Sequence, residues 1–240
     1  MKVAFSFAIY GSLKKYCQGL VENLQLIQQH YPSFYTFVYV YDDVPREYID
    51  IYQSFPNVCI VKSIHYNKPN MVDRFFVLDQ DPTVDIMIVR DADSRIHNRD
   101  RYCIDHFIES SYKCHTIRDH YAHHSPIMGG LWGLKRGFLN ADLQSYYNMY
   151  SYLAKEDPNN YGHDMNFFRM FMYKFLSPSL IIYSFSHALA LHPSENLHII
   201  PNTIQDNDFC GQVIIYDEKD NPIREFSHPG ELSMLAHTQQ

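Results

Sequence analysis

The first 95 residues alternate between short apolar runs and longer segments with helical periodicity. Four runs have the length and the flanking turns of strands that are buried on both faces of a sheet, and they cover residues 3–10, 35–41, 58–62 and 85–89. The segments between them carry apolar residues every three or four positions, which predicts helices after Ser12, over 46–54 and from Asn70 to about residue 79. This alternation predicts an α/β fold, in which helices cover both faces of a mostly parallel central sheet.

The second part of the chain has a less regular pattern. Its apolar residues predict helices over 100–110, 140–155 and 162–175, extended segments over 113–117 and 179–185, a glycine-rich loop that enters a strand over 125–134, and a hairpin of 211–216 with 222–227. The chain contains no internal repeat and no low-complexity linker. We therefore expect residues 1–240 to form a single domain.

Composition and charge exclude several classes of protein. Hydrophobic residues make up 46% of the 240, which is enough for a substantial core, and the net charge of −7 argues against a nucleic-acid partner. The longest apolar runs are too short to span a membrane, and residues 1–10 match a buried strand better than a signal peptide. The five cysteines are scattered, without a disulfide framework or a metal-binding pair, so a cytoplasmic location is expected.

A pair of carboxylates follows the fourth predicted strand. Asp91 and Asp93 are two residues apart, and ligands of parallel α/β sheets bind beyond the carboxyl ends of the strands. Two such carboxylates can jointly bind a hard divalent cation such as Mn²⁺ or Mg²⁺. A polar turn with solvated or ion-paired aspartates is the structural alternative.

Three segments around this pair carry a family resemblance. They are RFFVLDQDPTVDIMIVRDADSR over 74–95, RDHYAHHSPIMGGLWGLK over 118–135 and YGHDMNFF over 161–168. Together and in this order they resemble a family of GT-A glycosyltransferase-like proteins of bacteria, protists and large viruses, and they are similar to family-8-like retaining transferases. The resemblance implies a GT-A (Rossmann-like) fold in which residues 1–95 bind a nucleotide-diphosphate sugar, UDP-sugar being favoured. Residues 96–240 would then face a glycan or protein acceptor, and transfer would retain the anomeric configuration.

The resemblance also assigns roles around the metal. Asp91 and Asp93 are expected to bind Mn²⁺ or Mg²⁺, and Asp164 is expected to contact the donor sugar near the reacting carbon. Met165 stands where the family pattern usually has glutamine, which leaves the donor preference open. For a third metal ligand we favour His187 by its position, with His192 and His198 as alternatives.

Other residues are expected to bind the donor. Arg74 and Arg90 offer guanidinium forks for the diphosphate, although Arg90 can instead form a structural ion pair. By the resemblance to GT-A proteins, Ala8 and Tyr10, at the end of the first strand, are expected to hold the nucleotide base, and a buried tyrosine is the structural alternative for Tyr10. Ala92 lies between the two aspartates.

The glycine-rich loop is expected to face both substrates. Gly129 and Gly130 permit close approach of the backbone to a ligand, and Trp132 offers a ring face to the acceptor. A tight turn beside a core tryptophan is the structural alternative. His120 and His124 lack the glutamate and the long helix of a zinc hydrolase.

Two other functions remain open. A non-catalytic protein that binds nucleotide or glycan would share the same motifs, and Met165 favours this alternative. A sugar nucleotidyltransferase on a related fold is less well supported, because the segment AIYGSLKKY after the first strand lacks the expected glycine-rich loop.

Overall fold

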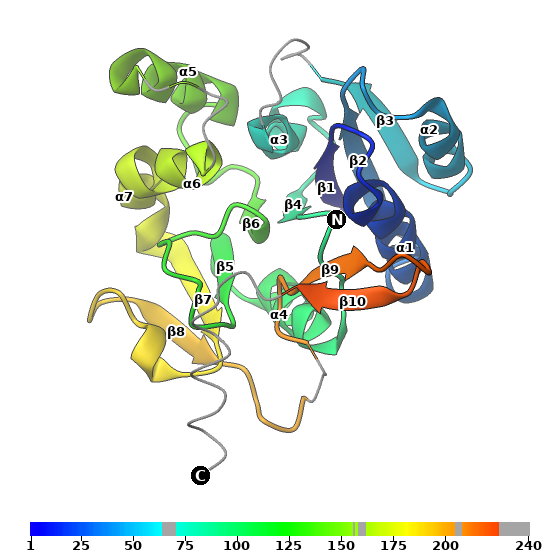
Figure 1. The fold of residues 1–240 in the computed structure, drawn as a ribbon. Coiled ribbons are helices and arrows are strands. Elements are labelled where there is room, and N and C mark those ends of the chain that lie inside the picture. Colours follow the sequence, from blue (N-terminus) through cyan, green and yellow to red (C-terminus); the bar gives the residue numbers. More distant parts are fainter. Residues whose placement is uncertain (64–70, 156, 158–161, 205–207, 226–240) are drawn as a thin grey trace.

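The computed structural model describes residues 1–63, 71–155, 157, 162–204 and 208–225. The expected helix cap Asn70 and the first residue of the YGHD segment lie outside these ranges. Within them, an eight-stranded sheet has the order β3-β2-β1-β4-β6-β5-β7-β8, and a separate hairpin pairs two further strands (Figure 1).

The strands follow the predicted runs closely. Their bounds are β1 Val3–Ile9, β2 Tyr35–Val40, β3 Val58–Lys62, β4 Ile86–Arg90, β5 Cys114–Arg118, β6 Leu131–Lys135, β7 Leu180–Ser184, β8 Asn196–Ile199, β9 Val213–Tyr216 and β10 Pro222–Glu225. In the large sheet only β6 runs antiparallel to its neighbours, β4 and β5. The carboxyl ends of the other strands in that sheet therefore lie at one edge, which confirms the predicted α/β class with a mostly parallel sheet.

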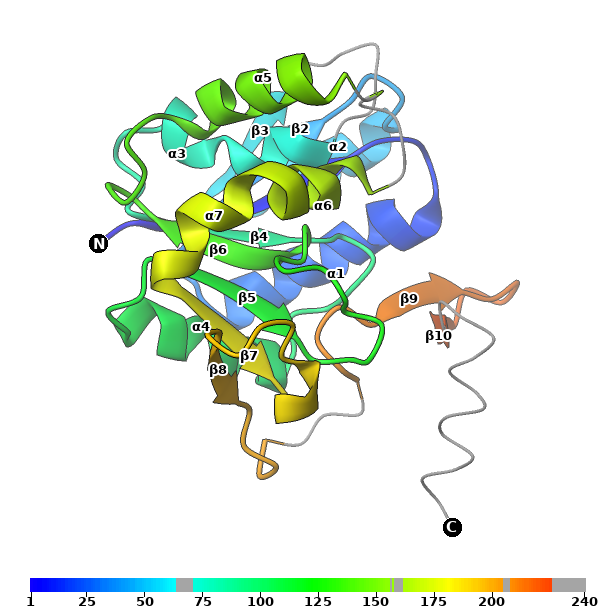
Figure 2. The same ribbon diagram turned by 90° about the vertical axis from the view of Figure 1, so that its left-hand side faces the viewer.

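Helices cover both faces of this sheet (Figures 1 and 2). The α-helices are α1 Lys14–His30, α2 Arg46–Gln53, α3 Val77–Gln80, α4 Asn98–Glu109, α5 Leu143–Ala154, α6 His163–Phe167 and α7 Tyr173–Leu176. Shorter turns are the 3₁₀ segments η1 Met71–Phe75, η3 Ser177–Ser179 and η4 His187–Leu189 and the π-helical η2 Phe168–Met172. No helix among the described residues is both long enough and apolar enough to cross a membrane.

Strand β1 shows why the sequence forms two cores. Phe5 and Phe7 point to one face and join the cluster that α1 and α4 cover, whereas Ala4 and Ala8 point to the other face, under η1. Alternation along the strand separates the two faces, and each buried phenylalanine contributes roughly 1.5–3 kcal/mol. Small residues on the second face leave room for η1, which carries Arg74.

Two local predictions differ from the structure. Helix α1 begins at Lys14 with Leu13 at the N-cap and without a side-chain cap, so Ser12 does not cap it. Strand β8 was not predicted, because its sequence NLHI mixes polar and apolar residues and only its pairing with β7 makes it a strand.

Candidate active site

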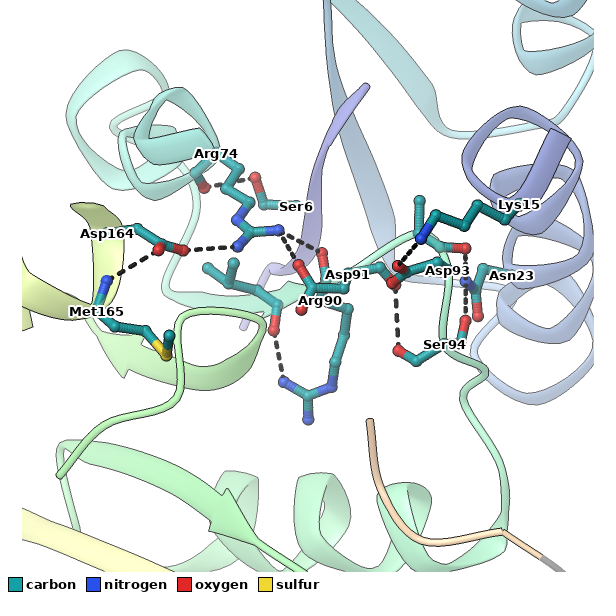
Figure 3. A network of polar contacts seen from close by, with 12 residues as sticks. Ser6, Lys15, Asn23, Arg74, Arg90, Asp91, Asp93, Ser94, Asp164 and Met165 are labelled. Carbon is teal, nitrogen blue, oxygen red and sulfur yellow. Dashed lines mark hydrogen bonds and ion pairs between the residues drawn. The ribbon is translucent and has the colours of Figure 1, made fainter. Parts of the chain in front are cut away.

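Arg74 is the centre of a charged cluster at the carboxyl edge of the sheet. Its guanidinium donates through Nη1 to Oδ1 of Asp91, and through Nη2 to Oδ2 of Asp164 at 3.2 Å (Figure 3). The Arg74 side chain is only 2% exposed. Ser6 Oγ donates to the Arg74 carbonyl at 2.6 Å, which fastens η1 to β1. The structure thus brings together three predicted site residues that are up to 90 positions apart.

Asp93 lies beside this cluster in a more enclosed position. Its side chain is 13% exposed, and the ammonium of Lys15 lies 4.0 Å from Oδ2. Burial, with the negative charge of Asp91 as the second cause, raises the pKa of Asp93 to about 6. Lys15, in the first turn of α1, is a site residue that we did not predict. Its position just after the first strand is the signal that the sequence offered.

The loop that carries the two aspartates is held from both sides. From α1, the buried Asn23 donates to the Ser94 carbonyl at 2.7 Å and accepts from the Ile96 amide at 3.1 Å. From the C-terminal hairpin, the Ile214 amide donates to the Asp93 carbonyl at 2.8 Å. A loop fixed in this way holds its carboxylates in place before any ligand arrives.

Gly129 and Gly130 lie against the same carboxylates. A Cβ atom on Gly130 would lie 1.8 Å from Oδ2 of Asp91, and one on Gly129 would lie 2.2 Å from Oδ2 of Asp164. Any side chain at either position would therefore displace a carboxylate from Arg74. The close approach predicted for these glycines is to the site aspartates themselves.

Tyr10, Ala8 and Ala92 lie near the cluster in different settings. Tyr10 is half-buried, with its ring centroid 5.9 Å from that of Tyr16 and 6.1 Å from that of Tyr41. Burial raises the pKa of its hydroxyl, and the charges of Arg74, Asp93, Asp91 and Asp164 also act on it. Ala8 and Ala92 are buried, at 4% and 3% exposure.

Arg90 and Trp132 lie beneath the site. Arg90 is 1% exposed, and it donates through Nε at 3.0 Å and Nη2 at 2.8 Å to Asp100, so the alternative of a structural ion pair describes it. Trp132 is fully buried between Phe75 and Phe168, with ring centroids 5.1 and 4.8 Å away. The indole has no face open to an acceptor, and the alternative of a core tryptophan describes it.

The candidate third ligands do not join the aspartates. His187 is exposed in η4, at the carboxyl end of β7. Nδ1 of His192 contacts Ser194 Oγ at 2.7 Å, and Nε2 of His198 contacts the Tyr102 hydroxyl at 2.7 Å. Across the described ranges, no group of three or more His, Cys, Asp or Glu side chains is gathered closely enough to hold a metal ion.

The residues that are present nevertheless fit a hard divalent cation. Asp91, Asp93 and Asp164 bring three carboxylates against the two cations Arg74 and Lys15. The cluster keeps an excess of negative charge, and its donors are the oxygen atoms that Mn²⁺ and Mg²⁺ prefer. Such ions often keep several water or phosphate oxygens in their coordination sphere, so two protein carboxylates suffice.

Comparison with known proteins shows the fold. No family model matches the sequence, and no curated protein matches it. The structure is similar to that of the galactosyltransferase LgtC in complex with donor and acceptor sugar analogues, with a TM-score of 0.50, 9% identity, and coverage of 83% of this chain and 85% of that chain. This chain has a GT-A fold.

Two further structures have lower scores. One is a glycosyltransferase involved in the glycosylation of the major capsid of PBCV-1, with a TM-score of 0.49, 12% identity, and coverage of 77% of this chain and 82% of that chain. The other is 4-diphosphocytidyl-2C-methyl-D-erythritol synthase from Anaerococcus prevotii DSM 20548. Its TM-score is 0.48 and its identity 12%, and the match covers 84% of this chain and 92% of that chain.

Proposed function

We propose that this protein is a metal-dependent glycosyltransferase that moves a sugar from a nucleotide-diphosphate sugar, with UDP-sugar favoured, to a glycan or protein acceptor. The observation that carries the proposal is the convergence of Asp91, Asp93 and Asp164 around the buried Arg74, at the carboxyl edge of the sheet. Ligands of open α/β sheets bind at this edge. Charge that is fixed there before binding can stabilise charge that develops in a reaction.

Asp91 and Asp93 are the residues that would hold Mn²⁺ or Mg²⁺. When bound, such an ion supplies Lewis-acid stabilisation of the departing nucleoside diphosphate. Gly130 leaves the space that Asp91 Oδ2 occupies, and the hydrogen bond from Ile214 fixes the backbone of Asp93. The chain's own contribution is to keep the two carboxylates oriented, with Asp93 enclosed and Asp91 open to a ligand.

Arg74 and Asp164 would orient the donor sugar. Asp164 Oδ1 accepts from the Met165 amide at 2.8 Å, and Oδ2 accepts from Arg74, so both oxygens have fixed directions. Burial raises the pKa of Asp164, and the charge of Arg74 opposes that shift. A carboxylate held in this way can accept hydrogen bonds from sugar hydroxyls and restrict the ring to one pose.

Lys15 adds a positive charge beside Asp93. It is partly exposed, and its ammonium lies at the outer limit of an ion pair with Asp93. We infer that the Lys15 ammonium turns toward the diphosphate when the donor binds. A phosphate oxygen within hydrogen-bond distance would be a stronger partner than the Asp93 carboxylate at 4.0 Å.

Retention is part of the proposal. An inverting transferase needs a carboxylate base on the acceptor side, and Asp164 is held by Arg74 instead of facing an acceptor. Met165 provides a thioether where a glutamine amide would offer hydrogen bonds, so we infer a donor sugar whose reactive face needs no such amide.

The test is nucleotide release from a panel of UDP-, GDP- and CMP-sugars, first with Mn²⁺ and then with EDTA. We expect slow release from a UDP-sugar without any acceptor, and its loss with EDTA. Metal-dependent binding without release would support the non-catalytic alternative. If no member of the panel bound at all, the proposed donor site would be wrong.

A further inference from the structure

We propose that Tyr121 and Phe185 form a carbohydrate-stacking platform that binds an uncharged oligosaccharide acceptor. Its role as an acceptor subsite rests on the proposed function, but its ability to bind sugar does not. Tyr121 lies in the loop between β5 and β6, and Phe185 directly follows β7. Their rings meet edge to face, with centroids 4.9 Å apart and planes at 81°.

The topology places this platform on the same edge as the charged cluster. Strands β4, β5 and β7 all end there, so Asp91, Tyr121 and Phe185 follow three parallel strands. In the sheet order, β5 lies two places and β7 three places from β4, which is roughly 10 and 15 Å at the usual strand spacing. In Figure 1 the segment between β5 and β6 lies beside β7.

The loop connects the platform directly to the donor side. Eight residues after Tyr121, Gly129 approaches Asp164, and Gly130 approaches Asp91. Burial lowers the pKa of His123, two residues after Tyr121, to about 4, and the charge of Asp91 acts weakly in the opposite direction. The loop therefore links Tyr121 to the carboxylates of the charged cluster.

The Tyr121 ring is exposed but its loop is held firmly. Tyr121 is 50% exposed, although Phe185 covers part of it. The neighbouring His120 stacks on Phe209 with centroids 4.0 Å apart, and His123 Nδ1 accepts from the Asp119 amide at 3.1 Å. A large exposed ring on a fixed loop loses little conformational entropy when a ligand covers it.

The chemistry of the platform favours an uncharged sugar. Tyrosine presents a flat apolar face with a hydroxyl at its rim, which matches the C–H face and the hydroxyl edge of a pyranose. The sequence contains no Lys, Arg, Asp or Glu from 120 to 134 or from 185 to 194, so these segments supply no permanently charged partner for a phosphate or a charged peptide, and their polar groups are mainly histidines and serines. Because the platform lies farther from Asp91 than one sugar ring reaches, the ligand is a disaccharide or longer.

The first measurement is of binding alone. Saturation-transfer NMR with lactose, maltotriose, cellotriose and chitotriose, in the presence of UDP and the diamagnetic Mg²⁺, tests wild type, Tyr121→Ala, Tyr121→Phe and Tyr35→Ala. Tyr35 is the control, because it is a 38% exposed tyrosine at the start of β2, on the opposite edge of the sheet. We expect at least one oligosaccharide to bind, and we expect Tyr121→Ala to weaken binding about tenfold. Tyr35→Ala should bind like wild type, and Tyr121→Phe, which keeps the ring face and loses only the hydroxyl, should weaken binding much less than Tyr121→Ala does.

Nucleotide release separates this inference from the proposed function. Tyr121→Ala should release nucleotide from the donor at the wild-type rate without acceptor, and it should lose the acceleration that the bound oligosaccharide gives. If none of the oligosaccharides bound, or if Tyr121→Ala bound them as wild type does, the platform would be wrong while the donor site stood. If sugar bound through Tyr121 but no donor turned over, the platform would stand and the transferase proposal would fail.

Discussion

The proposed donor side and the proposed acceptor side of the sheet edge consist of different kinds of side chain. On the donor side Arg74, Asp91, Asp93 and Asp164 lie in mutual contact or close proximity, and their backbones are fixed by hydrogen bonds. On the acceptor side Tyr121 presents a neutral ring at the surface. Bond breaking needs charge that is oriented beforehand, whereas recognition of a sugar ring needs a flat face. Damage to one side should therefore change a different quantity from damage to the other.

The largest expected effect comes from filling the space beside Asp91. In Gly130→Ala the new methyl group would overlap the Asp91 carboxylate and separate it from Arg74. We expect donor-dependent nucleotide release to fall by up to about a thousandfold, because the Asp91 carboxylate would lose the orientation that Arg74 gives it. Steady-state kinetics with the best donor of the panel provide the measurement.

Gly137→Ala is the matched control for that variant. Gly137 has a positive φ of 79° and no atom near its missing Cβ, so alanine there costs about 1 kcal/mol of stability through backbone strain alone. Its nucleotide release should equal that of wild type. Equal losses in both variants would mean that glycine substitution harms the fold in general, and the contact with Asp91 would have no special role.

A smaller effect, confined to turnover, is expected at Asp164. Asp164→Asn keeps the shape and one oxygen but removes the charge that faces Arg74. We expect kcat to fall about a hundredfold while the Kd for UDP changes less than threefold, because the sugar and not the nucleotide is the proposed partner. Kinetics and calorimetry on one preparation separate the two quantities. A parallel loss of UDP affinity would make Asp164 a structural residue of α6.

Substitution of the buried His115 should have the smallest effect on activity at neutral pH. This residue is fully buried on β5, neither ring nitrogen has a hydrogen-bond partner among the described residues, and burial lowers its pKa well below the ordinary value. The folded state therefore keeps His115 neutral, while the unfolded chain takes up a proton below pH 6.5. Above pH 6.5 this difference in protonation does not reduce the free energy of unfolding. As the pH falls below 6.5, the free energy of unfolding decreases by up to about 1.4 kcal/mol per pH unit, because only the unfolded chain binds the proton.

Substitution of His115 should remove that part of the pH dependence. In His115→Leu, urea unfolding at pH 7.5, 6.5 and 5.5 should show a shallower fall in the free energy of unfolding than in wild type. Activity at pH 7.5 should be unchanged. The exposed His187→Ala is the control and should keep the wild-type slope. An unchanged slope in His115→Leu would show that other buried groups, such as His123, dominate acid unfolding.

Much of the fold followed from hydrophobic periodicity, since each strand of the first half is a continuous apolar run with a turn after it. Strand β8 did not follow, because NLHI becomes a strand only through its pairing with β7. Asp91 and Asp93 could be placed because they directly follow β4.

The detailed partners within the site could not be predicted from the sequence. That Arg74 pairs with Asp164 depends on how η1 and α6 pack, which no local pattern encodes. For the same reason the sequence could not show that Trp132 and Arg90 are buried structural residues. A tryptophan after a glycine-rich loop, or an arginine before an acidic pair, can contact a ligand or lie in the core. Only the burial of the side chain in the structure distinguishes the two cases.

We propose that Asp91 and Asp93 bind the donor through a divalent cation, and calorimetric titration of UDP with and without Mn²⁺ is the most direct test of this role. The comparison uses wild type, Asp93→Asn, and Asp50→Asn as an exposed carboxylate control on α2. We expect Mn²⁺ to tighten UDP binding in wild type and in Asp50→Asn and to have little effect in Asp93→Asn. UDP binding that is indifferent to Mn²⁺ in wild type, or an undiminished Mn²⁺ effect in Asp93→Asn, would contradict it.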